Sequence, residues 1–150
     1  MIIRSLTKQE VKAEPFRVWN AFVNLLATED YEYLAAEQRP AHLIFWYKHE
    51  VQNGGHLQFF ENRGTRHLTE TIQALGLLEA TNQQQILREA GELWFSHSRP
   101  CIQIVQDYCD IALQGEFDAL DSRFYKSTSA LVQYLEAYLE RHQSSFVSVT

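Results

Sequence analysis

The chain has 150 residues, enough for one domain that removes roughly 70% of its unfolded surface from water without metals or disulfides. Hydrophobic residues make up 45% of the chain and aromatic residues 13%, which excludes the disordered and low-complexity classes. The acidic residues number 19 and the basic residues 13, giving a formal charge of -6. This charge disfavours nucleic acid or an anionic membrane as a direct partner.

The first ten residues carry charges and lack the apolar stretch of a secretory signal. The longest apolar run, Leu43–Tyr47, is far shorter than the roughly 20 residues that cross a bilayer. Cys101 and Cys109 fall in one predicted helix, about 12 Å apart along its axis, which is too far for a disulfide. We therefore expect a cytoplasmic protein with reduced cysteines in its core.

Apolar side chains recur at helical spacing along the chain, which predicts an all-α, single compact domain over residues 1–150 with six or more helices. The apolar stripes run through residues 16–26, 43–51, 68–75, 86–94, 102–112 and 131–139. Thr7 with Glu10, and Thr81 with Gln84, match the capping box that begins a helix. No strand pattern competes, and we expect the tail, residues 144–150, to fray without a partner strand.

The segment around Asn53, Gly54 and Gly55 predicts a corner between two helices. Asn53 or Gly54 would end the first helix in the left-handed conformation, and Gly55 would let the next segment leave sharply. Asn-Gly is also a hairpin signal, but residues 43–51 have helical rather than strand periodicity. The helix-to-helix corner therefore fits better.

A second corner follows at Asn62 and Gly64, where glycine again permits a sharp turn. The two corners enclose a short helix that contains Phe59 and Phe60, which we expect to anchor it in the core. The fold should therefore include a short helix between two Gly-containing corners.

Glu50 lies in the last turn of the helix before the first corner, where the helix dipole disfavours a carboxylate by roughly 0.3–1 kcal/mol. We predict that free backbone donors near Gly55 and His56 compensate by hydrogen bonding to Glu50, which gives it a structural role. As an acid or base, Glu50 would need a second polar group, and His49 points to another face of the helix.

The run from Tyr47 to Gly64 and a second block at residues 120–125 resemble the bacterial DNA-mimic protein C-terminal domain family. With a closing segment at Tyr138, Leu139 and Phe146, the resemblance covers about residues 43–146. It implies an all-helical, non-enzymatic protein. One characterised member is an acidic dimer whose carboxylates imitate DNA phosphates and occupy the DNA-binding face of a transcription repressor. The motif residues in this chain are Glu50, Asn53, Gly54, Gly55, Phe59, Phe60, Asn62 and Gly64.

Two stretches contain acidic residues and no Lys or Arg, one between Arg17 and Arg39 and one between Arg99 and Arg123. The acids are Glu29, Asp30, Glu32 and Glu37 in the first acidic run, and Asp107, Asp110, Glu116, Asp118 and Asp121 in the second. If the runs meet in space, they form an acidic face for a protein partner with a basic surface, such as a transcription regulator. Otherwise each run is a solvated helix or loop face.

No nucleophile elbow, phosphate-binding loop or dinucleotide fingerprint appears, so we expect no catalytic residue and no cofactor. His42, His49 and His56 recur every seven residues. Helical ligands at this spacing lie about 10 Å apart along the axis, too far to share one ion. His97 and Cys101 supply only two ligands, and we expect no metal site.

Two other functions remain open. The first is a small-ligand-binding or enzymatic domain with a pocket lined by aromatic side chains such as Trp46, Tyr47, Trp94 and Tyr108. The second is a scaffold protein that forms a homodimer through an exposed apolar stripe.

Overall fold

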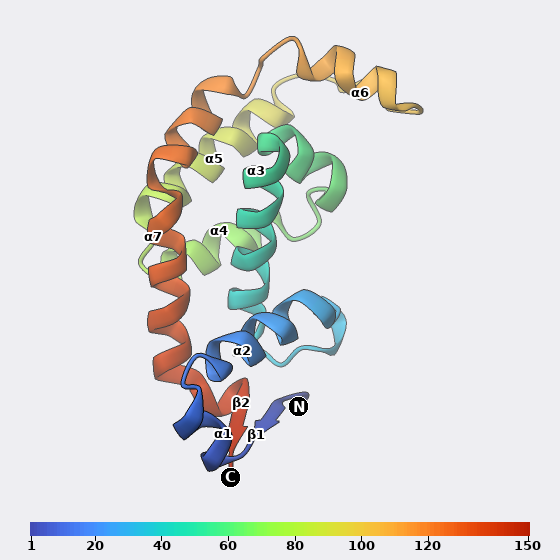
Figure 1. Cartoon of the computed structure of the whole chain (residues 1–150). Helices are drawn as coiled ribbons and strands as arrows, with labels where there is room; N and C mark the ends of the chain where they lie inside the picture. The colour runs from blue at the N-terminus through green and yellow to red at the C-terminus, as the bar shows by residue number, and fades with distance from the viewer.

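Seven α-helices account for most of the computed structural model, which describes all 150 residues (Figure 1). The all-α prediction of six or more helices is therefore confirmed. The helices are α1 (Lys8–Ala13), α2 (Arg17–Thr28), α3 (Arg39–Arg63), α4 (Leu68–Leu77), α5 (Thr81–Phe95), α6 (Val105–Ala112) and α7 (Asp118–His142). Two single 3₁₀ turns, η1 (Tyr31–Tyr33) and η2 (Gln143–Ser145), follow α2 and α7.

One of the two predicted capping boxes forms. The Thr7 hydroxyl accepts a hydrogen bond from the Glu10 backbone at 3.1 Å, and the Glu10 carboxylate accepts one from the Thr7 backbone at 2.8 Å, which begins α1. The box predicted at Thr81 is wrong, because α5 begins at Thr81 itself without a side-chain cap. Gln84 instead donates to the Ile72 carbonyl of α4 at 2.9 Å, a tertiary contact that replaces the local one.

The two ends of the chain pair with each other. β1 (Arg4–Leu6) and β2 (Val147–Val149) form a parallel two-stranded sheet, so the expectation of a frayed tail is wrong. The buried Gln38 amide donates to the carbonyls of Ile2 at 2.6 Å and Ser145 at 2.7 Å, and so joins both ends to the start of α3. Figure 1 shows the two termini close together at one end of the molecule.

The core is one cluster of 29 buried residues, to which α7 contributes along its length while packing on α3, α5 and α2 (Figure 1). Aromatic pairs connect these helices: Phe22 of α2 lies 4.8 Å from Phe146, and Tyr47 of α3 lies 5.4 Å from Phe124 of α7, measured between ring centroids. Each fully buried aromatic side chain contributes about 1.5–3 kcal/mol. The pairs therefore hold distant parts of the chain in one core.

The corner inside α3 is built from Gly54 (φ -154°) and Gly55 (φ 74°), whose backbone angles are not helical. The residue with positive φ is therefore Gly55, and not Asn53 or Gly54 as predicted. Gly64 (φ 64°) ends α3 and forms the second corner. A short helix of residues 56–63 lies between the two corners, which confirms that part of the fold prediction.

The segment of residues 100–115, which we call the arm, carries α6 away from the body of the molecule (Figure 1). No residue of α6 is buried. Cys101 precedes α6 and Cys109 lies within it, and both are exposed, so the prediction of core cysteines on one helix is wrong. The apolar spacing of residues 102–112 is real, but only Tyr108 and Ile111 pack against the core, whereas Val105, Cys109 and Ala112 are exposed. None of the helices combines the length and apolar character needed to cross a bilayer.

Candidate functional site

A chain of hydrogen bonds connects α7 to the first corner. The Asp121 Oδ1 atom accepts from the His56 backbone N–H at 2.9 Å and from His56 Nδ1 at 2.6 Å, and His56 Nε2 lies 2.8 Å from the Tyr47 hydroxyl. His56 and Tyr47 are fully buried. Burial, and secondly the Asp121 carboxylate, raise the pKa of Tyr47 well above its usual value. The phenol therefore stays protonated, has no access to a substrate, and holds the corner in place.

Glu50 is buried and accepts hydrogen bonds from three side chains on the short helix. The donors are Gln58 Nε2 at 2.9 Å, Asn62 Nδ2 at 2.9 Å and Arg63 Nε at 3.3 Å. The prediction that backbone donors compensate Glu50 is therefore wrong, since Asp121 of α7 takes the backbone N–H at the corner. The sequence could not show this exchange, because Asp121 is remote along the chain.

The remaining motif residues surround this network. Asn53 is exposed, and its Nδ2 donates to Gln58 at 3.3 Å. Phe59 and Phe60 are 4% and 1% exposed, respectively, so both side chains of the short helix lie in the core. The motif therefore lies in and around the packed corner, where no open cleft exposes Glu50.

Two acids of the first acidic run pair with arginines from outside the run. Glu29 Oε1 lies 2.8 Å from Arg4 Nη2, and both side chains are 24% exposed. Glu32 Oε1 lies 3.6 Å from Arg66 Nη1, with both side chains more than half exposed, so this pair is weak. The tertiary structure thus adds positive charge to a run that contains none in sequence.

Three acids of the second acidic run also have partners within the protein. Asp121 binds His56, and Asp107 accepts from the backbone of Ile104 at 3.1 Å to cap α6. Glu116 binds Arg99 Nη2 at 2.8 Å and His97 Nε2 at 2.8 Å. The hydrogen bond from Arg99 is the main cause that lowers the pKa of Glu116. The contacts of Glu116 with Arg99 and His97 close the base of the arm.

Four acids are exposed and have no ion pair: Asp30 and Glu37 in the first run, and Asp110 and Asp118 in the second. Figure 1 shows the first run beside the end of α2 and the second at the far end of the molecule, on α6 and the start of α7. The runs therefore form two separate acidic patches on one copy of the chain.

The four aromatic residues suggested for a pocket do not come together. Tyr47 is in the core, and Trp94 stacks on Phe60 with a centroid distance of 4.8 Å. Tyr108 borders an open groove beside the arm, and only Trp46 lines the cavity described below.

The histidines have separate environments as well. His49 is exposed and bonds the Phe45 carbonyl at 2.9 Å, whereas His56 belongs to the buried network and His97 contacts Glu116. The structure places no group of three or more His, Cys, Asp or Glu side chains where they could hold a metal ion.

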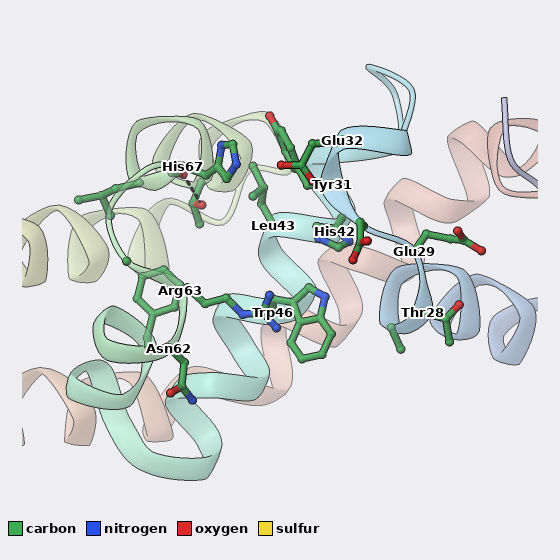
Figure 2. A pocket seen from close by; sticks show the side chains of 16 residues that line it. Thr28, Glu29, Tyr31, Glu32, His42, Leu43, Trp46, Asn62, Arg63 and His67 are labelled. Carbon is green, nitrogen blue, oxygen red and sulfur yellow. Dashed lines mark hydrogen bonds between the residues drawn. The ribbon is translucent and has the colours of Figure 1, made fainter. Parts of the chain in front are cut away.

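A cavity of about 290 Å³ lies between residues 27–32, α3 and the start of α4 (Figure 2). Its walls include charged and aromatic side chains. The Arg63 guanidinium lies 3.8 Å from the centre of the Trp46 ring, and the His67 ring lies 4.0 Å from the Tyr31 ring. Acids of the first run border the same space, so the first acidic patch and the cavity adjoin.

His42 lines the cavity and is 6% exposed, and its Nδ1 atom has no hydrogen-bond partner. Burial, and secondly the charge of Arg63, lower the pKa of His42 to about 4, so the imidazole is neutral at pH 7. Sequence reasoning considered His42 only as a metal ligand and did not select Arg63. The available signal was the spacing of His42 and Trp46, which are four residues apart and share a helix face.

No curated protein and no solved structure matches this chain. The family described as DMP19-like protein, in which DMP19 stands for DNA mimic protein 19, matches residues 32–142. The matched region includes both corners, the short helix and all of α7, and it confirms the resemblance seen in the sequence. The chain belongs to the DMP19-like protein family.

Proposed function

We propose that this protein is a non-enzymatic interaction protein that presents an acidic surface to a basic protein partner, such as a transcription regulator. Membership in the DMP19-like family is the observation that carries the proposal, because the family takes its name from a DNA mimic. The excess of 19 acids over 13 bases supports it, since a negative field attracts basic proteins and repels nucleic acid.

Exposure and ion pairing support an assignment of the acids that would contact the partner. We assign this role first to Asp30, Glu32 and Glu37, which we call the loop patch, because they are exposed and at most weakly paired. Asp110 and Asp118 form a second, distant contact. Glu29, Asp107, Glu116 and Asp121 support the structure through the partners described above, and they add to the field without needing to touch the partner.

The buried network supports a non-enzymatic role. Tyr47, His56 and Asp121 are arranged in the order that a general acid or base would use, but Tyr47 and His56 are fully buried. Stabilisation of the corner in α3 explains the arrangement of all three side chains.

A salt-dependent capture experiment tests the proposal. The wild-type protein is immobilised and exposed to a lysate of its own host cell at low and high ionic strength. We expect capture of basic proteins that decreases steeply with salt. The triple variant Asp30→Asn, Glu32→Gln, Glu37→Gln should lose this capture. A matched control changes three exposed, unpaired acids of α5 and α7, namely Glu92, Glu136 and Glu140, to Gln.

The control removes the same charge from another surface and should keep the partner. Equal capture by the loop-patch variant would contradict the assignment of the surface. Recovery of only neutral, salt-insensitive proteins by the wild type would contradict the charge-based function itself.

Homodimer formation is a second candidate function, favoured by the arm. Ile104, Val105 and Leu113 are 61%, 79% and 85% exposed, and a short helix that packs only through Tyr108 and Ile111 is marginal in water. A second copy that covers these side chains would stabilise α6. Sedimentation equilibrium should then show a wild-type dimer that dissociates in Val105→Ser with Leu113→Ser but not in Leu77→Ser, an exposed control in α4. A monomeric wild type would exclude this candidate.

A further inference from the structure

The cavity between residues 27–32, α3 and the start of α4 is lined by charges of both signs, and these charges are only partly paired within the protein (Figure 2). We propose that this cavity binds a small zwitterion of the amino-acid class, a molecule with an ammonium group and a carboxylate. This site shares Asp30 and Glu32 with the loop patch, but binding of a small molecule here requires neither a partner protein nor the acids of the arm, so it can be measured independently of the proposed function.

The negative groups are on the loop after α2. Asp30 lines the cavity without an ion pair, and Glu32 has only the loose 3.6 Å contact with Arg66. Glu29 is held by Arg4 at 2.8 Å, so it is less free to receive a ligand. An ammonium group would therefore find its acceptors at Asp30 and Glu32.

The positive group is Arg63 on the opposite wall. Its Nε atom contacts Glu50 at 3.3 Å, whereas its two terminal nitrogens have no hydrogen-bond partner. Stacking on Trp46 holds the guanidinium plane, so the free edge is ordered before any ligand arrives. A planar guanidinium edge of this kind binds a carboxylate through two parallel hydrogen bonds.

His42 provides a buried polar atom, Nδ1, that has no hydrogen-bond partner within the protein. It is neutral, 6% exposed, and its Nδ1 atom makes no hydrogen bond. An unpaired polar atom in a buried place is destabilising, and a ligand that bonds to it removes this penalty. Its presence in the wall indicates that the cavity is built for a polar occupant.

Charge favours a zwitterion over the simpler ligands. A plain cation would leave the terminal nitrogens of Arg63 without a partner, and a plain anion would leave the carboxylate of Asp30 without one. A zwitterion satisfies both sides at once. The cavity volume of about 290 Å³ is at the lower limit of the roughly 300–1,000 Å³ typical of small-molecule sites, so a molecule of amino-acid size fits it.

Binding is measured by following the Trp46 indole N–H signal in NMR titrations, after assignment with Trp46→Phe. The probes are lysine, glycine and ω-amino acids of increasing length, each compared with the matching alkylamine and carboxylic acid. We expect a saturable shift with at least one zwitterion, and binding at least about tenfold weaker for its two singly charged analogues. Saturation by the amine or the acid alone at equal strength would overturn the proposal, as would no saturation with any zwitterion.

Asp30→Asn should weaken binding of the tightest-binding zwitterion by at least about tenfold. The variant removes the free acceptor from an exposed loop without disturbing the core. Glu37→Gln is the matched control, since it removes the same charge outside the cavity and should leave binding unchanged. Equal weakening in both variants would indicate a general charge effect and overturn the assigned site.

Discussion

The Asp121 carboxylate lies directly over the corner in α3, with its Oδ1 atom 2.9 Å from the His56 backbone nitrogen. It occupies the space that a side chain at position 55 would need. Gly55 also has a φ of 74°, a conformation that other residues adopt at a cost. The glycine and the carboxylate therefore depend on each other, although 65 residues separate His56 from Asp121 in sequence.

Gly55→Ala should decrease the free energy of unfolding by about 3 kcal/mol, because the change combines backbone strain with displacement of Asp121. Gly64→Ala is the matched control. Gly64 also has positive φ (64°), but no atom lies within 4 Å of the added methyl, so we expect a loss of only about 1 kcal/mol. Urea denaturation measures both values. Equal losses would show that the contact with Asp121 adds nothing to the backbone strain.

Glu50→Ala should decrease the free energy of unfolding by about 1–3 kcal/mol, since Gln58, Asn62 and Arg63 lose a shared acceptor. For a chain of this length, the melting temperature falls by about 2–4 °C per kcal/mol. Glu92→Ala, at an exposed position of α5, should change it by less than about 1 °C. A melting temperature unchanged by Glu50→Ala would remove the structural role of Glu50.

His42 should make the stability dependent on pH. Its pKa is about 4 in the folded protein against a usual value of 6.5, so between these values the unfolded chain binds a proton that the folded chain does not. The contribution of neutral His42 to the free energy of unfolding is therefore complete above pH 6.5. It is lost as the pH falls towards 4, by up to about 3 kcal/mol. The nearby charges are Arg63, which lowers this pKa, and Asp30 and Glu32, which oppose that effect.

Melting temperatures at pH 7.5 and pH 5 test this prediction. His42→Gln should reduce the difference in melting temperature between the two pH values. His49→Gln, at an exposed histidine, should keep the wild-type difference in melting temperature. An identical pH profile in His42→Gln and the wild type would show that His42 titrates normally in the folded protein.

Glu116→Gln should loosen the arm without unfolding the core. Glu116 binds Arg99 and His97 at the base of the arm, and Arg99 is 14% exposed. A local loss of one or two kcal/mol of stability raises the fraction of molecules in which the arm is open by about 5–30-fold. Hydrogen exchange in residues 100–115 should accelerate accordingly, while α3 and α7 keep their protection. Asp110→Asn, on the arm but away from its base, should leave exchange unchanged, and acceleration across the whole chain would point to global destabilisation instead.

The helices were predictable because the residues that determine a helix are close together in sequence. Apolar spacing located α2, α3, α4, α5 and α7, and the capping box at Thr7 located α1, since neighbours along the chain decide whether a helix begins. The strands were not predictable, because β1 and β2 contain three residues each and depend on pairing between opposite ends of the chain. Periodicity in 102–112 showed an amphipathic segment but could not show whether the protein itself covers it.

For the acidic residues as well, some properties follow from the sequence and others only from the tertiary structure. Their number, and their concentration in two runs, follow from the sequence, as does the corner motif that shows the family. Which acids remain free depends on Arg4, Arg66, Arg99 and His56, all of which lie outside the runs in sequence and approach them only when the chain folds. Coulombic attraction and hydrogen bonding depend on distance in space. For that reason the paired acids, the separation of the two patches and the cavity around His42 emerged only from the folded arrangement.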